Sequence, residues 1–140
     1  TLPAAVWGRV VVTLWKRLVC LLEVQQGETA EDGDSRSVRG LQVRGVGYGG
    51  GKRKRTGQDI CGTLMIVFQF TLLGDCRHGR RPGFSAAAEP EQARKLYEYT
   101  AEKCRSSGLH TETGRFQTDM TVSLDNTGPV TILLDSRKLF

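Results

Sequence analysis

Hydrophobic positions along this chain form short, dense runs that alternate with polar and glycine-rich stretches. Residues 9–14 and 18–24 are two such runs, rich in β-branched residues or leucine and of strand length. They predict two buried strands joined by a turn at residues 15–17, which contains no Gly or Asn. Thr29 follows as a helix N-cap, with Asp32 three positions later, and this pair predicts that a helix begins there.

The strongest patterns lie in the second half of the chain. Residues 62–75 form its most hydrophobic run and predict a central strand buried on both faces, with a glutamine and a threonine as polar exceptions. A basic loop is expected at residues 76–84. Pro90 then opens a predicted helix, with Gly108 as its C′ residue. One face of this helix is set by residues at helical spacing: Ala93, Leu96, Tyr97, Thr100, Ala101 and Cys104.

The C-terminal part alternates apolar and polar residues at Met120, Val122 and Leu124, and then continues into an apolar run at residues 130–135. This pattern predicts a β-hairpin that ends the domain. Because two helices lie among these strands, we expect residues 1–140 to form a single α+β domain. This domain would combine mixed and antiparallel β-sheets with two helices.

The composition agrees with one globular domain, since 39% of the 140 residues are hydrophobic and 25% are charged. A net charge of +5 favours an anionic partner, RNA ahead of a membrane. Four cysteines without C-x-x-C spacing and only two histidines give a metal site no ligand pattern. Arg9, Lys16 and Arg17 interrupt the apolar N-terminal part, so we expect no membrane span and a cytoplasmic location. The chain begins at Thr1, which leaves open whether it is a fragment.

A glycine-rich, basic segment spans residues 44–57. Gly45, Gly47 and Gly50 match G-x-G-x-x-G, but no helix start follows them, which disfavours a dinucleotide site. A P-loop does not fit either, because Val46 stands where its first glycine belongs. Four consecutive basic residues of the segment form either a solvated loop or a phosphate-binding patch, and the sequence leaves both open: Lys52, Arg53, Lys54 and Arg55.

Two stretches of the second half resemble one known family. They read QFTLLGDCRHGRRPGFSAAAEPEQARKLYEYTAEKC, from Gln69, and TGRFQTDMTVSLDNTGPVT, from Thr113. They are similar to D-aminoacyl-tRNA deacylases (D-tyrosyl-tRNA(Tyr) deacylases), whose signature motifs read Ser-Gln-Phe-Thr-Leu and Asn-x-Gly-Pro-Val-Thr. The resemblance implies a homodimeric hydrolase that cleaves the ester between a D-amino acid, or glycine, and the terminal adenosine of tRNA. It also implies that L-aminoacyl-tRNA is spared and that neither a metal nor an organic cofactor takes part. The fold it implies is a barrel-like β-β-α sandwich.

The resemblance assigns catalytic and pocket residues. Backbone N–H groups near Phe70 and Thr71 would face the substrate's carbonyl oxygen, the Thr71 hydroxyl would line the same spot, and Gln69 would brace them by hydrogen bonds. Phe116 and Met120 would wall the pocket for the adenosine and the amino acid. An activated ester needs a water molecule and a stabilised oxyanion. The chain offers no convincing Ser/His/Asp arrangement, and we interpret its two histidines as surface or structural residues.

The resemblance of the second motif implies how the enzyme would distinguish D from L substrates. In the family its Gly-Pro bond is cis, which here would be the bond between Gly128 and Pro129. The carbonyls of these two residues would project into the pocket of the partner subunit and hold the substrate's amino group. With main chain closing the opposite side, an L side chain would meet a wall while a D side chain would point outward.

The chain departs from the family pattern at several positions. Phe68 stands where the first motif has serine, and its ring is bulky enough to fill the pocket that the serine borders. Trp15, Arg17 and Glu23 replace family glycines, and the family's opening strand is expected to be missing. These departures keep an alternative open, namely a catalytically silent, nucleic-acid-binding relative of the same fold.

Overall fold

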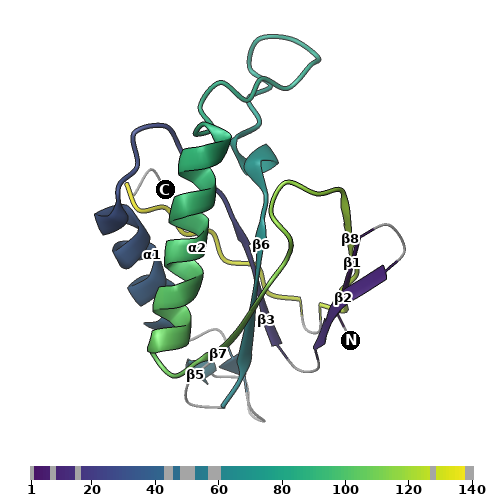
Figure 1. The fold of residues 1–140 in the computed structure, drawn as a ribbon, viewed down its shortest axis with the longest axis vertical. Coiled ribbons are helices and arrows are strands. Elements are labelled where there is room, and N and C mark those ends of the chain that lie inside the picture. The colour runs from purple at the N-terminus through teal and green to yellow at the C-terminus, as the bar shows by residue number, and fades with distance from the viewer. Residues whose placement is uncertain are drawn as a thin grey trace.

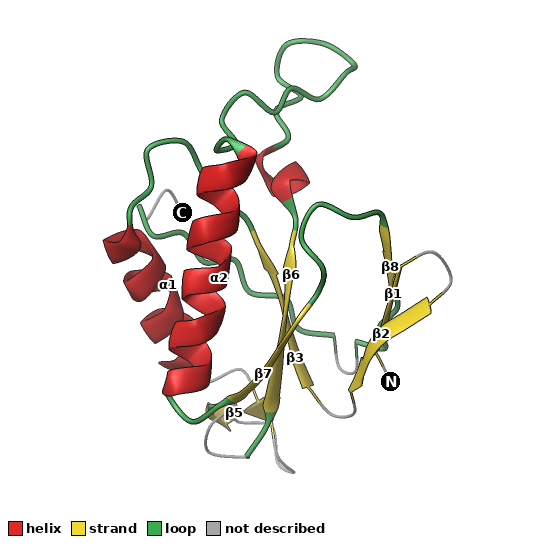
Figure 2. Cartoon of the chain, viewed as in Figure 1, coloured by secondary structure: helices red, strands yellow, loops and turns green. Residues whose placement is uncertain are grey.

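The computed structural model describes residues 2–6, 9–14, 17–42, 46–47, 53–56, 61–126 and 129–137. Within these ranges the chain is a layered α+β structure with two α-helices and one short 3₁₀ helix (Figure 1, Figure 2). The elements, in chain order, are β1 (Leu2–Val6), β2 (Arg9–Leu14), β3 (Arg17–Leu22), α1 (Ala30–Gln42), β4 (Val46–Gly47), β5 (Arg53–Arg55), β6 (Thr63–Phe68), η1 (Phe70–Leu73), α2 (Pro90–Ser106), β7 (His110–Thr113) and β8 (Met120–Val122).

The central sheet is parallel, with the order β3-β6-β7. Its middle strand, β6, is buried on both faces as predicted: Met65, Ile66 and Val67 are each 1% exposed. The strand ends earlier than predicted, because β3 ends at Leu22 and leaves residues 69–75 without a strand to pair with. The Gln69 N–H makes the last bond to β3, 2.8 Å to the Leu22 carbonyl, and the chain then turns into η1.

Both predicted helices are present, and they lie side by side over one face of the central sheet (Figure 1). α1 begins directly after Thr29, whose N–H donates to the Asp32 carboxylate at 2.9 Å, as expected for a capping pair. α2 buries all six residues of its predicted apolar face. It ends at Ser106, and Gly108 adopts a φ of +86°, which suits the C′ position. Among the described residues, no helix is long and apolar enough to span a membrane.

A second sheet, antiparallel with the order β2-β1-β8, lies beside the first (Figure 1). The two predicted N-terminal strands are confirmed as β2 and β3, but they belong to different sheets. β2 pairs with β1, a strand that the sequence pattern did not predict. The absence of the family's opening strand stays a prediction.

The predicted C-terminal hairpin is wrong for the described residues. β8 takes β1 as its partner, and residues 129–137 form no strand. Pro129 has no N–H for a ladder. The side chain of Asn126 bridges the turn instead, its Oδ1 accepting from the Val130 N–H at 3.4 Å. The segment then runs back to the loop before α1, where the Arg137 guanidinium donates two hydrogen bonds of 3.1 Å (Figure 1).

The hydrophobic core lies on both sides of β6, because successive strand residues point to opposite faces. On the face away from the helices, Met65 and Val67 pack with Met120 and Val122. The face beneath the helices holds two larger clusters, whose buried members are Leu22, Ile66, Tyr97, Ala101 and Cys104 in one and Val24, Ala93 and Leu96 in the other.

Candidate functional site

The first signature segment lies where β6 ends. Gln69, Phe70 and Thr71 follow this strand at the carboxyl edge of the parallel sheet, where open parallel sheets commonly bind ligands. The Gln69 side-chain amide donates to the Thr71 hydroxyl. The structure therefore brings the two polar side chains of the segment together, in the contact that a bracing role for Gln69 requires.

Phe70 connects this segment to the long loop before α2. Its side chain is 47% exposed, and its ring meets Phe84 edge-on with 5.1 Å between centroids. Gly74 allows the chain to turn closely here, because a Cβ at this position would lie 3.1 Å from the Thr71 carbonyl and 3.2 Å from the Phe84 ring. The segment is thus held from the loop side as well as from β6.

The predicted basic loop is present and projects beyond the signature segment (Figure 1). Asp75 and Gly83 close it by exchanging two backbone hydrogen bonds of 2.8 and 2.9 Å. Arg77 binds the Asp75 carboxylate at 2.7 Å, and hydrogen bonds from Arg77 lower the pKa of Asp75 to about 2. The loop also carries Arg80 and Arg81, both exposed.

Phe68, which replaces the motif's serine, packs into the core beneath α2. Its ring centroid lies 4.5 Å from that of Phe116 and 5.8 Å from that of Tyr97. The Arg94 guanidinium lies over Phe116, 5.1 Å from the ring centroid. Phe68 therefore contacts one of the expected pocket residues from the core side.

Met120 lies in a different cluster from Phe116. It packs with Met65 and Val67 on the face of β6 away from the helices, whereas Phe116 packs with the helix-side clusters. Gly114 lies close to Met120, since a Cβ at this glycine would be 3.2 Å from the Met120 sulfur. The structure does not bring Phe116 and Met120 into one cluster, and their joint role stays a prediction.

Two further expectations fall partly outside the described residues. Gly128 is not among them, so neither the geometry of its bond to Pro129 nor the direction of its carbonyl is described. Pro129 itself is exposed. Lys52 also lies outside, while Arg53–Arg55 form β5, a short strand paired with β4. The choice between a solvated segment and a phosphate-binding patch therefore stays open.

Neither histidine belongs to the signature segment. His78 belongs to the exposed basic loop, and His110, on β7, places Nε2 2.9 Å from Glu112 Oε1. Within the part of the chain that the structure describes, no three His, Cys, Asp or Glu side chains are grouped to hold a metal ion.

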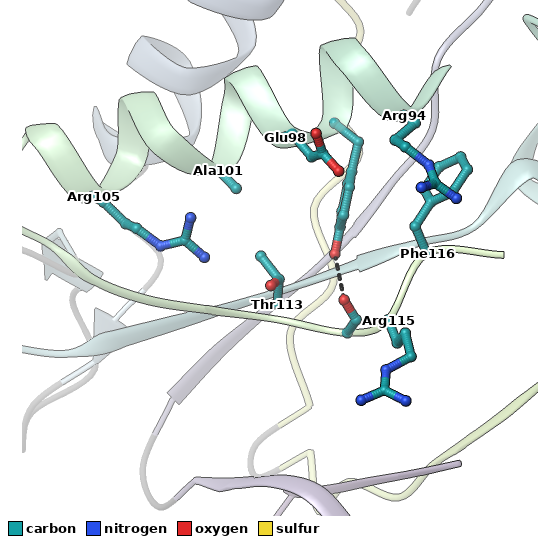
Figure 3. Close-up of a pocket in the computed structure, with 9 residues that line it drawn as sticks. Arg94, Glu98, Ala101, Arg105, Thr113, Arg115 and Phe116 are labelled. Carbon is teal, nitrogen blue, oxygen red and sulfur yellow. Dashed lines mark hydrogen bonds between the residues drawn. The ribbon is translucent and has the colours of Figure 1, made fainter. Parts of the chain in front are cut away.

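Sequence reasoning missed a pocket of about 410 Å³ between α2 and the segment that follows β7 (Figure 3). Part of its lining was predicted for other reasons, Tyr97 and Ala101 as core and Phe116 as a site residue. The spacing of Arg94, Glu98 and Arg105 on one face of α2 was a signal in the sequence. That spacing does not reveal that residues 113–116, which follow β7, lie against this face. The lining consists of Arg94, Tyr97, Glu98, Ala101, Arg105, Thr113, Gly114, Arg115 and Phe116.

Comparisons with known proteins agree with this arrangement. The family model for D-Tyr-tRNA(Tyr) deacylase matches residues 4–135. The D-aminoacyl-tRNA deacylase of Symbiobacterium thermophilum is 50% identical over 137 residues, which cover 96% of this chain and 89% of the relative. That of Thermosipho melanesiensis is 45% identical over 134 residues, covering 95% and 89%. The solved structure of the c-Myc DNA Unwinding Element Binding Protein superposes with a TM-score of 0.86 at 27% identity, covering 94% of this chain and 89% of that one. The chain therefore belongs to the D-Tyr-tRNA(Tyr) deacylase family.

Proposed function

We propose that this chain is a tRNA-editing hydrolase that cleaves the ester of D-aminoacyl-tRNA and of glycyl-tRNA, and that spares L-aminoacyl-tRNA. Curated relatives that carry the name D-aminoacyl-tRNA deacylase and match most of this chain support the proposal. The observation that carries it is the signature segment at the end of β6, where the Gln69 amide holds the Thr71 hydroxyl.

The proposed chemistry relies on backbone donors instead of a side-chain nucleophile. In η1 the Leu72 N–H is the first to bond back, at 3.2 Å to the Gln69 carbonyl. The N–H groups of Phe70 and Thr71 precede it, at the end of a helix where donors lack intrahelical acceptors. Directed at the ester carbonyl, they would stabilise the oxyanion that forms when water attacks. Neither a metal nor an organic cofactor is part of this proposal.

A second copy of the chain completes the proposed site. The carbonyls of Gly128 and Pro129 from the partner would hold the substrate's amino group, while Phe116 and Met120 would wall the adenosine. Large apolar side chains that are exposed in these parts of the chain support such a homodimer, because an exposed apolar surface commonly marks an interaction site. They lie beside the signature segment and along the C-terminal part of the chain: Phe70, Leu72, Leu124, Ile132, Leu133 and Leu134.

Hydrolysis of D-tyrosyl-tRNA and L-tyrosyl-tRNA tests the activity directly. We expect release of D-tyrosine and no acceleration for the L form. Thr71→Ala removes the hydroxyl that lines the site but keeps both backbone N–H donors, so it is expected to lower the rate by less than the roughly 10²-fold typical of a lost oxyanion donor. Thr121→Ala, at an exposed position of β8, is the matched control and is expected to leave the rate unchanged. Equal rates for the D and L substrates, or none for either, would contradict the proposed function.

The oligomeric state tests the proposed partner contribution. Leu133 is 70% exposed, and Leu133→Asp places a charge in the C-terminal apolar segment. We expect this variant to elute as a monomer in size-exclusion chromatography with light scattering, and to lose hydrolysis of D-tyrosyl-tRNA. Ser106→Asp adds the same charge at the exposed end of α2 and is expected to remain dimeric. A monomeric wild-type protein with full activity would overturn the shared site.

A further inference from the structure

We infer that the pocket between α2 and residues 113–116 binds the sugar–phosphate backbone of the tRNA 3′ strand, next to the terminal adenosine. This inference rests on the proposed function for its choice of RNA. It concerns three arginines, Arg94, Arg105 and Arg115, that the resemblance does not assign to any role. We call these residues, with the pocket they line, the arginine pocket.

The arginine pocket is built from two elements that meet at the edge of the core (Figure 3). From α2, Arg94, Glu98, Ala101 and Arg105 lie at positions i, i+4, i+7 and i+11, which places them along one face of the helix. The opposite wall is the segment that leaves β7. Tyr97 ties the two together, because its hydroxyl donates to the Gly114 carbonyl at 3.2 Å. The shape of the pocket is therefore fixed by buried contacts.

The charge of the arginine pocket favours an anion. Its lining carries three guanidinium groups against one carboxylate, that of Glu98. Among the described residues, Arg94 and Arg115 form no ion pair, and both side chains are exposed. Arg105 is partly engaged, since its Nε donates to the Thr111 carbonyl at 3.2 Å and its Nη1 lies 3.5 Å from Glu102. The guanidinium groups of Arg94 and Arg115 thus remain available for a ligand, together with the Nη2 group of Arg105, which takes part in neither contact.

The dimensions and chemistry favour a nucleic acid strand over a small anion. Arg94 and Arg105 are eleven residues apart on α2, which corresponds to roughly 16 Å along the helix axis. A single phosphate or carboxylate cannot contact both ends of such a pocket, whereas successive phosphodiesters can. Arg94 also lies over the Phe116 ring. Guanidinium groups beside an aromatic face are a common surface for single-stranded RNA, which pairs phosphates with cations and stacks its bases.

The position of the pocket relative to the signature segment indicates that its ligand is the 3′ strand of the tRNA. Phe116 lines the pocket and packs against Phe68, and Gln69 to Thr71 follow Phe68 directly in the chain. A strand whose terminal adenosine lies near Thr71 would therefore reach the arginine pocket with the nucleotides that precede the adenosine. The pocket would position the substrate without touching the ester.

The salt dependence of tRNA binding tests this inference. The probe is unacylated tRNA, and the variant is Arg94→Gln with Arg115→Gln. If each arginine contacts one phosphate of a single strand, the slope of log affinity against log salt should shrink by about 0.7 per residue, or roughly 1.4 for both. Lys95→Gln with Lys103→Gln removes the same charge from α2 outside the pocket, where these lysines pair with Glu91 and Asp34. This control is expected to keep the wild-type slope.

Two further measurements keep the inference falsifiable and separate it from the proposed function. Arg94→Lys with Arg115→Lys retains both charges and should retain the slope, so a loss in the glutamine variant alone reflects charge and not misfolding. Hydrolysis of D-tyrosyl-adenosine, which has no phosphates, should be equal in the wild-type and glutamine proteins. An unchanged slope in the glutamine variant overturns the arginine pocket and leaves the deacylase proposal standing. Failure of the wild-type protein to hydrolyse D-tyrosyl-adenosine and D-tyrosyl-tRNA rejects the deacylase proposal, while a reduced slope would still support an RNA site.

Discussion

The two faces of β6 are buried to the same extent but are covered in different ways. Ile66 and Met65 are adjacent in the strand, point to opposite faces, and are each 1% exposed. On the Ile66 side, α2 buries its apolar stripe in the core clusters, and α1 packs against α2. The Met65 face is covered by β8, and the segments that continue from β8 expose large apolar side chains, with Leu124 48% and Leu133 70% exposed.

One chain therefore covers one face of β6 completely, whereas the elements over the other face leave large apolar side chains exposed. The helix-covered face is closed by contacts within the chain and should dominate the stability of the monomer. The opposite face ends in apolar residues that contact solvent, and the second signature motif lies in that same C-terminal part. Stability and assembly should therefore respond to mutations on different faces.

The largest effect is expected from a deletion on the helix-covered face. Ile66→Ala removes three buried carbon atoms from the main cluster and is expected to lower the free energy of unfolding by about 2–5 kcal/mol. Leu133→Ala, in the C-terminal segment, should change it by no more than about 0.5 kcal/mol in the monomer. Urea denaturation at concentrations where the chain is monomeric measures both. A comparable loss for the two variants would remove the contrast between the faces.

Phe68 and Phe70 offer a second comparison between a packed and an exposed apolar side chain, at the signature segment. Phe68 packs against Phe116 and Tyr97, so Phe68→Ser is expected to lower the free energy of unfolding by about 3 kcal/mol. Phe70 is 47% exposed, and Phe70→Ser should cost about 1 kcal/mol. If the Phe68 ring also fills the substrate pocket, as the sequence suggested, Phe68→Ser will hydrolyse D-tyrosyl-tRNA faster at a temperature where it remains folded. A rate at or below that of the wild type would limit the role of Phe68 to packing.

Tyr97 joins α2 to the segment that follows β7, and removing its hydroxyl is expected to cost less than Ile66→Ala. It donates to the carbonyls of Ile66, at 3.0 Å, and Gly114, at 3.2 Å. Tyr97→Phe leaves both buried carbonyls without this donor and should cost about 1–3 kcal/mol.

The pH dependence of this variant gives a second measurement. Burial raises the pKa of Tyr97 to about 12, from an unfolded value near 10. The protonated hydroxyl is thus favoured by folding, and its contribution is fully present below about pH 10 and lost as the pH rises towards 12. The difference in unfolding free energy between wild type and Tyr97→Phe should shrink over that interval. A constant difference would show that the hydroxyl is not buried in solution.

The sequence predicted best where the structural information is local. α2 has its proline at the start, its apolar residues at helical spacing and its glycine at the end, and all three features lie within the helix or two residues beyond it. The predicted end of β6 failed because it depends on where β3 ends, more than forty residues earlier in the chain. β2 and β3 look alike as hydrophobic runs, yet one pairs locally and the other pairs with β6.

In the candidate site, too, the local features could be predicted from the sequence and the long-range contacts could not. The order Gln69-Phe70-Thr71 was readable from the motif, and the hydrogen bond between Gln69 and Thr71 needs only their spacing. The arginine pocket was not readable, because helical periodicity places Arg94 and Arg105 on one face but does not reveal that Arg115 lies opposite. The hairpin prediction failed for a related reason: alternation identifies a strand such as β8 but not its partner, which is β1.

The smallest effect is expected at the start of α1, where a local hydrogen bond supports the helix-covered face from its edge. The Thr29 N–H donates to the Asp32 carboxylate at 2.9 Å, and the Thr29 hydroxyl lies 3.2 Å from the same oxygen. Asp32→Ala should lower the free energy of unfolding by about 0.5–1 kcal/mol at pH 7, in the range of a lost helix cap. Glu31→Ala removes a carboxylate from the same turn without removing this bond and is the matched control.

Acid titration distinguishes the capping bond from the charge of the first turn. The hydrogen bond from the Thr29 backbone lowers the pKa of Asp32 below its ordinary value. The stabilising contribution is therefore present above the unfolded pKa of about 3.9, and it is lost as the pH falls through the lower folded value. The difference between wild type and Asp32→Ala should accordingly be constant from pH 7 to about pH 5 and should decline below about pH 4. A decline confined to Asp32→Ala identifies the bond to Thr29 as its source, and the same change in the Glu31→Ala control would contradict that assignment.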